Sequence, residues 1–383
     1  MALALREVTA LLERLAPLEH AEPWDNVGLL LEPATDRREP GAAPSVRRAL
    51  LLVDFTEKAL DEALERDVDL VVAYHPPIFE PLKRLRAASP AERVVLAAAR
   101  AGLAVYSPHT ALDAAPGGVN DWLAEAVGSG ARRPLVFARR TERAEAFKLV
   151  VFVPAEHTEA LRSALAQAGA GVIGNYTECS FELAGTGTFL GGSEANPAVG
   201  ERGRLERVPE TRLEMVCPEE ALSRAAAALR RVHPYEEPAW EIHPLAPKPV
   251  PDFGAGRAVE LDEPVMLDAL VERVKAHLGR PWVRVAAAPE HARGAPIHRV
   301  AVCAGSGGGL LSGASELDLY VTGELRHHDV LRALARGTSV VLCEHSSSER
   351  GFLRRFAERL REVAAGGIEV LVSEADRDPV EIG

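Results

Sequence analysis

Hydrophobic positions in the first third of the chain alternate between helical and strand-like spacing. Residues 5–17 place leucine and valine at three- and four-residue intervals, which predicts an amphipathic helix. Continuous apolar runs predict buried strands at 47–56, 69–79 and 103–110. Helices are predicted between them at 57–66, with Thr56 as its N-cap, and at 91–102. This alternation predicts parallel strands covered by helices.

The pattern changes near residue 145. Strands are predicted at 147–154, 179–192, 204–218 and 236–245, and helices at 155–169 and 218–232. The resulting order, β-α-β-β-α-β, is that of a ferredoxin-like domain. Residues 245–256 hold three prolines and two glycines, which favours a linker.

Strand and helix spacing then alternate again. A strand running into a glycine loop is predicted at 298–309, further strands at 317–324 and 338–345, and helices at 327–337 and 346–365. The simplest architecture is α/β, with a discontinuous core and a parallel-rich sheet built from residues 1–140 and 255–383. A ferredoxin-like α+β domain at 145–246 would be inserted into that core.

Composition narrows the class of protein. The 383 residues have 47% hydrophobic and 26% charged side chains, and no apolar run of membrane-spanning length occurs. The N-terminal residues lack the features of an export signal, so we expect a cytoplasmic protein. A net charge of −12 argues against nucleic acid as a partner. The four cysteines form no CxxC pair, so any metal would be held by nitrogen and oxygen.

Histidines and carboxylates gather just beyond four predicted strands, where the sites of parallel α/β sheets form. Neutral imidazole and carboxylate together suit Zn²⁺, Fe²⁺ or Mn²⁺. Carboxylates can also bridge two ions. The candidates are His75, His109, Asp113, Glu324, His327, His328, His345 and Glu349.

Each pattern also has a purely structural explanation. Ser346 and Glu349 have the spacing of a helix capping box, which needs no metal. His75 could simply end a strand before two prolines, and Asp113 could cap a turn. The glycine loop 305–309 fits either a phosphate cradle or a plain tight turn, and it lacks the lysine of a Walker motif.

Taken together, the motifs resemble those of the NGG-interacting-factor-three-like family, whose members are also named GTP cyclohydrolase I type 2 homologues. The resemblance runs through almost the whole chain, including an optional PII/CutA-like insert. It rests on the segments AEPWDNVGL at 21–29, YHPPIF at 74–79, SPHTALD at 107–113, TGELRHHD at 322–329, EHSSSER at 344–350, GAGVIGNY at 169–176, GTGTF at 185–189 and HPYEEPA at 233–239.

The resemblance implies a toroidal homohexamer with two divalent metal ions per chain on its inner wall. The family's ligands correspond here to His75, Asp113, His345 and Glu349, with Glu349 as the bridge between the ions. Tyr74 stands where the family has its first histidine. Three arrangements are therefore open. Tyr74 ligates as a phenolate, His109 or Glu344 replaces it, or one ion is weakly held, so we expect one or two ions per chain.

The activity that the family name implies is hydrolytic opening of the guanine imidazole ring of GTP, with release of formate. His109, Glu324, His327 and His328 are the candidates for moving protons. One alternative is a non-catalytic, metal-binding hexamer with a regulatory or scaffold role. Another is a different metal-dependent phosphohydrolase, because two-metal centres also suit phosphoester cleavage.

Overall fold

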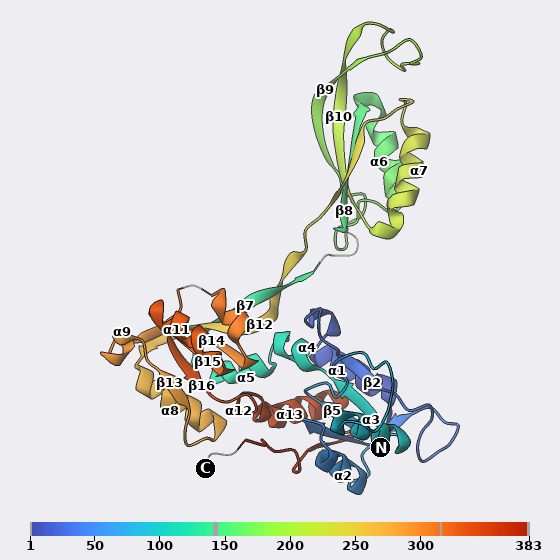
Figure 1. The fold of residues 1–383 in the computed structure, drawn as a ribbon. Helices are drawn as coiled ribbons and strands as arrows, with labels where there is room; N and C mark the ends of the chain where they lie inside the picture. Colours follow the sequence, from blue (N-terminus) through green and yellow to red (C-terminus); the bar gives the residue numbers. More distant parts are fainter. Residues whose placement is uncertain (1, 141–144, 315, 381–383) are drawn as a thin grey trace. The chain divides into compact units, whose positions relative to one another are not determined.

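A computed structural model of the chain describes residues 2–140, 145–314 and 316–380. The chain divides into two compact units (Figure 1). The first unit contains the residues up to Ala138 and those from Val250 onward, and the second unit is Arg139–Pro249. Within the described residues, no helix has both the length and the apolar character needed to cross a membrane.

The first unit contains a five-stranded sheet with the order β17-β4-β5-β6-β2. Its strands are β2 (Gly28–Leu31), β4 (Arg48–Leu52), β5 (Leu70–Ala73), β6 (Ala104–Ser107) and β17 (Glu369–Val372). The first four strands in the sheet order are parallel, and β2 is antiparallel to β6. Because β17 pairs with β4, strands from the two ends of the chain share one sheet.

Helices cover both faces of this sheet, and this explains its continuous apolar strands. Leu50 and Leu52 of β4 pack with one cluster of buried residues, while Leu51 packs with the other. Thr56 caps α2 as predicted, since its hydroxyl accepts a hydrogen bond from the Ala59 amide. The helices on this side of the unit are α1 (Leu5–Leu15), α2 (Glu57–Glu65), α3 (Pro90–Arg100), α4 (His109–Ala114), α5 (Val119–Glu125), α12 (Ser347–Arg350) and α13 (Phe352–Ala364).

Six further core strands form a separate sheet instead of extending the first one, while β1 (Leu3–Ala4) and β3 (Ser45–Val46) pair as a short two-stranded sheet. The six-stranded sheet has the order β13-β16-β15-β14-β12-β7, with β14, β15 and β16 parallel. The strands are β7 (Gly130–Arg140), β12 (Lys248–Val265), β13 (Arg284–Ala286), β14 (Ile297–Ser306), β15 (Leu319–Glu324) and β16 (Ser339–Leu342). The helices here are α8 (Leu267–Leu278), α9 (Pro289–Ala292), α10 (Gly308–Ser312) and α11 (His327–Ala335). The α/β class is confirmed, with two sheets that both contain parallel strands.

Two predictions of local structure need correction. The boundary between the two units falls between Pro249 and Val250, inside the predicted linker 245–256, but most of this segment lies within β12, whose exposed Pro249 and Pro251 stand at the start of the strand, where proline is tolerated. The predicted helix 346–365 is divided into α12 and α13 at Gly351. A Cβ atom at Gly351 would lie 2.5 Å from the Trp122 ring, so the aromatic packing requires glycine here.

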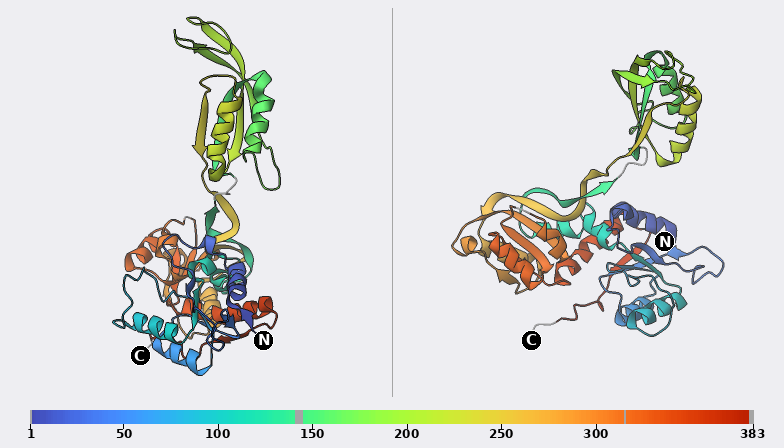
Figure 2. Two further views of the ribbon diagram at one scale, coloured as in Figure 1. Left: turned by 90° about the vertical axis from the view of Figure 1, so that its right-hand side faces the viewer. Right: turned by 45° about the horizontal axis from the view of Figure 1, so that its top comes forward.

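The second unit is an antiparallel four-stranded sheet with the order β11-β8-β10-β9. Helices α6 and α7 lie side by side on one of its faces (Figure 1, Figure 2). Its elements are β8 (Phe147–Pro154), α6 (Thr158–Gln167), β9 (Phe181–Leu190), β10 (Leu205–Cys217), α7 (Leu222–Val232) and β11 (Trp240–Pro244). Each was predicted from the spacing of its apolar residues, and alternate residues of β8 and β10 form the core under the helices.

Candidate metal centre

Residues from opposite ends of the chain meet in the first unit. His75 follows β5, His345 follows β16, and Glu349 lies on α12. One ligand atom from each of the three lies within 4.8 Å of the other two. His75 Nε2 is 3.5 Å from Glu349 Oε2, and His345 Nε2 is 3.3 Å from Glu349 Oε1. The three side chains therefore form a candidate metal-binding group, which we call the triad.

Each histidine of the triad is oriented by a further carboxylate of its own, in addition to Glu349. His75 Nδ1 contacts Asp54 Oδ1 at 2.9 Å, and His345 Nδ1 contacts Glu324 Oε1 at 3.1 Å. These contacts leave each Nε2 directed at Glu349. Metal-ligating histidines almost always have such a partner on their other ring nitrogen. Glu324, predicted as a residue that moves protons, is thus placed to position His345.

Glu349 is the buried member of the triad, with 4% of its surface exposed. Its Oε2 atom has no hydrogen-bond partner among the described residues. Burial opposes ionisation of the carboxyl, but His345 and His75 outweigh it and lower the pKa of Glu349. An ionised, buried carboxylate oxygen is costly unless a cation lies beside it, and here that cation is either the protonated His75, 3.5 Å from Oε2, or a bound metal ion.

Gly305, at the end of β14, leaves space for a ligand beside this carboxylate. A Cβ atom at position 305 would lie 2.6 Å from Glu349 Oε1 and 3.2 Å from His345 Nε2. The residue also has a φ of +62°, a conformation that favours glycine. Within the glycine loop, Gly305 is therefore the residue that leaves space beside the triad.

The capping-box explanation of Glu349 is not observed. The Ser346 side chain makes no cap hydrogen bond, and its hydroxyl oxygen accepts one from Arg350 Nε at 2.9 Å. The side chain of Glu349 contacts the two histidines instead of the helix start. Its position four residues after His345 therefore brings both residues to one site.

Asp113, a predicted ligand, lies close to the triad but is not part of it. Its Oδ1 atom accepts a hydrogen bond from the Tyr74 hydroxyl. Burial raises the pKa of Asp113 to about 6, and burial together with the Asp113 charge raises the pKa of Tyr74 well above 10. The phenol thus keeps its proton and donates it in a hydrogen bond to the carboxyl, where the family pattern would place two ligands.

His109 forms a second pair with a carboxylate that the sequence pattern did not reveal. Its Nδ1 atom lies 2.8 Å from Asp25 Oδ1, and the amide and hydroxyl of Thr110 donate to Asp25 Oδ2. Burial opposes ionisation of Asp25, but His109 and Thr110 lower its pKa overall. Asp25 and Asp54 are far from the histidines in sequence, so only the fold brings them together.

A cavity of about 670 Å³ connects these groups. Tyr74, His109, Asp113, His345 and Glu349 all line it. Among the described residues, the lining does not include four predicted candidates. Two of them, His75 and Glu324, contact Glu349 and His345 respectively, and the other two, His327 and His328, lie exposed in the first turn of α11.

Comparison with known proteins decides the family. The model of the Duf34/NIF3 (NGG1p interacting factor 3) family matches residues 3–379. The chain belongs to the NIF3 family. It is 36% identical to NIF3-like protein 1 of Rattus norvegicus, over 99% of this chain and 92% of that protein. It is 34% identical to the GTP cyclohydrolase 1 type 2 homolog of Bacillus subtilis, over 98% of this chain and 97% of that one.

A solved NIF3 structure agrees over the same length. The Bacillus cereus protein related to NIF3 is 31% identical, with a TM-score of 0.62, and the match covers 100% of this chain and 99% of that one. The resemblance stated from the motifs is thereby confirmed. The NIF3 family assignment applies to both units, because the match extends over the whole chain.

Proposed function

We propose that the chain is a divalent-metal-dependent hydrolase that opens the imidazole ring of GTP, consuming water and releasing formate. The observation that carries the proposal is the Glu349 carboxylate, buried between two oriented histidines at the wall of a nucleotide-sized cavity. The names of relatives as GTP cyclohydrolase 1 type 2 homologs supply the reaction class.

The triad fits a divalent ion. Two neutral imidazoles and one carboxylate suit Zn²⁺, Fe²⁺ or Mn²⁺, and their outer partners have the arrangement expected of a metal site. A divalent ion held there would supply a Lewis acid and lower the pKa of water at neutral pH. The hydrogen bond between Tyr74 and Asp113 competes with a second site, so we propose one tightly held ion per chain.

His109 is the residue best placed to move a proton. The ionised Asp25 accepts from Nδ1–H and so fixes the tautomer in which Nε2 is free to accept a proton. His109 lines the cavity together with His345 and Glu349. It would take a proton from water and return it to the leaving group at the opened ring.

The position of Trp24 is evidence for a planar substrate. Trp24 lines the cavity although 61% of its surface is exposed, and Phe79, 48% exposed, lies beside it with ring centroids 6.0 Å apart. The loops that carry the two rings are joined because the Asn26 side chain donates to the Ile78 carbonyl. A fixed, exposed aromatic pair beside a polar site suits stacking of a purine base.

We further propose that residues 145–246 form a PII/CutA-like domain inserted between core segments 1–140 and 255–383. The element order of the second unit and its strand order β11-β8-β10-β9 support this assignment. We also propose that the chain assembles as a toroidal homohexamer, which sedimentation of the purified protein would test by mass.

The decisive assay incubates protein loaded with Mn²⁺, Zn²⁺ or Fe²⁺ with GTP and measures formate and a fluorescent pterin. Both products are expected from the wild type, and neither from Glu349→Gln. Absence of both products with all three metals would refute the GTP assignment. Release of phosphate without formate, or of phosphate from simple phosphoesters, would identify a phosphohydrolase. Full metal loading with no turnover of any substrate would favour a binding protein.

A further inference from the structure

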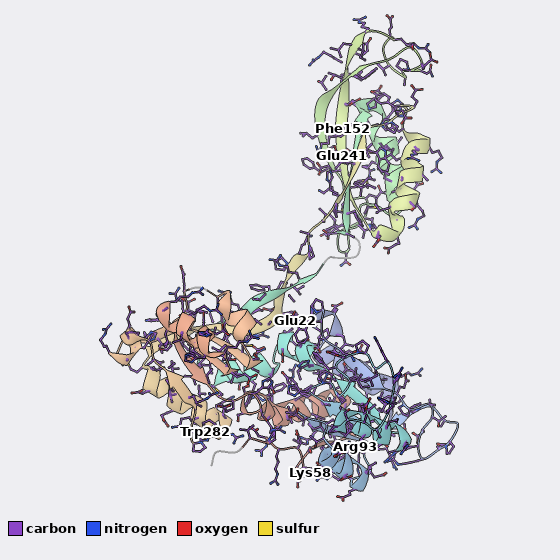
Figure 3. The ribbon with its side chains drawn as sticks, in the orientation of Figure 1. Glu22, Lys58, Arg93, Phe152, Glu241 and Trp282 are labelled. Carbon is purple, nitrogen blue, oxygen red and sulfur yellow. The ribbon has the colours of Figure 1, made fainter. Side chains whose placement is uncertain are left out.

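The second unit has a cavity of its own, far in sequence from the triad motifs. It measures about 600 Å³ and lies beside β9, β10 and Phe152 of β8, which is labelled in Figure 3. Two motifs that the proposed hydrolase does not use both line it, namely residues 185–189 and the stretch from Tyr235 to Glu237. Their convergence on one cavity calls for a role separate from metal binding.

The segment 233–239 is held rigidly around Phe152. The His233 ring, which is buried, contacts the Phe152 carbonyl through Nε2 at 2.9 Å, and its Nδ1 accepts from the Tyr235 amide at 3.1 Å. The Phe152 amide in turn donates to the Ala239 carbonyl at 3.1 Å. Both ends of the segment are therefore fixed, and the residues between them are preorganised at the cavity.

The walls combine aromatic rings with a carboxylate. The Phe189 and Tyr235 rings pack edge to face with centroids 6.2 Å apart. The Tyr235 hydroxyl donates to Glu210 Oε1 at 2.8 Å, and no described residue donates to Glu210 Oε2. A Cβ atom at Gly187 would lie 2.1 Å from that oxygen, so glycine lets the carboxylate keep this position without moving.

The charge of the lining favours a cation. Glu210, Glu236 and Glu237 line the cavity, and Arg212 is its one positive side chain among the described residues. Arg212 is already engaged, because its Nε donates to Glu214 at 2.8 Å and its guanidinium lies over Phe152 at 5.6 Å. The free oxygen of Glu210 and the nearby aromatic rings are both attractive to an ammonium group.

We propose that this cavity binds a small organic ammonium ion with an apolar or aromatic body. The ammonium group pairs with Glu210, and the apolar body packs between Phe152, Phe189 and Tyr235. The site lies wholly within the second unit, so it does not depend on the proposed hydrolase activity.

The test titrates the full-length protein with phenethylamine and with 3-phenylpropionate, which share the same aromatic body and differ in charge. Calorimetry or saturation-transfer NMR should show saturable binding of the amine, at least about tenfold tighter than that of the acid. The variant Glu210→Gln, which keeps an oxygen for Tyr235, should weaken amine binding about tenfold. Glu182→Gln, on the same strand as Gly187 but outside the cavity lining, is the matched control and should bind like the wild type.

The comparison of amine with acid uses the wild-type protein alone, so it tests the proposal even if Glu210→Gln alters folding. Thermal unfolding would reveal whether the variant is folded. The proposal is overturned if the wild type binds neither probe at millimolar concentration, or both equally. It is also overturned if a folded Glu210→Gln protein binds the amine as tightly as the wild type does.

Discussion

Metal binding to the triad should release protons, and the structure sets how many. Burial opposes protonation of His75, but its hydrogen bond with Asp54 and the nearby Glu349 carboxylate raise the pKa of His75 to about 10. Contact with Glu349, against the effect of burial, raises the pKa of His345 to about 9. Both imidazoles are therefore protonated at pH 7 in the metal-free protein, and only the neutral form binds metal.

Each histidine must lose its proton for an ion to bind, so about two protons should leave per ion at any pH below 8. Lowering the pH therefore stabilises the protonated, metal-free form and weakens metal binding. Between pH 8 and pH 7 the association constant for Zn²⁺ should fall about a hundredfold. Above pH 9 the dependence should fall to about one proton per ion, because His345 is then largely neutral while His75 still carries its proton up to about pH 10.

The assay is calorimetric titration of Zn²⁺ in buffers of different ionisation enthalpy, combined with chelator competition at several pH values. Asp54→Asn removes one partner of His75 and should reduce both the number of protons released and the slope. His328→Gln, outside the cavity lining, should leave both unchanged. Release of no protons at pH 7, with the affinity independent of pH, would refute the reasoning about the charged histidines.

Three further outcomes are expected. Trp24→Ala should raise the KM for GTP about tenfold in steady-state assays while changing kcat much less, because the ring supplies stacking and no proton. Gly351→Ala should destabilise the fold by about 1–3 kcal/mol in urea unfolding, because its methyl group meets the Trp122 ring. Arg257→Ala should cost about 3–5 kcal/mol in the same measurement, since it removes a buried guanidinium and leaves Asp121 with the Gly117 amide as a donor but without its ion-pair partner.

Local patterns were sufficient to predict many elements. The apolar spacing of β8 and the N-cap at Thr56 are encoded within a few residues, so they could be predicted without knowing the rest of the fold. Features that depend on distant packing were not predictable in this way. The need for glycine at position 351 depends on Trp122, and β12 lies in its sheet between β7 and β14, strands far away in sequence.

The residues of the candidate site also fall into those that local spacing or motifs could predict and those that depend on the fold. His345 and Glu349 have a spacing that suggested a shared face, and the family motifs brought His75 into the same group. Asp54 and Asp25 had no such signal, because their role depends on which histidine the fold places beside them. The pairing of Tyr74 with Asp113 likewise follows from burial and proximity rather than from spacing along the chain.

The central claim is that the triad holds a metal ion. The most direct test is metal content per chain combined with anomalous scattering from crystals of the metal-loaded protein. The account predicts one strongly occupied position in contact with His75, His345 and Glu349, and a second position beside Asp113 only in Tyr74→His. Metal-loaded crystals with no anomalous peak at the triad, or with the ion bound elsewhere, would contradict it.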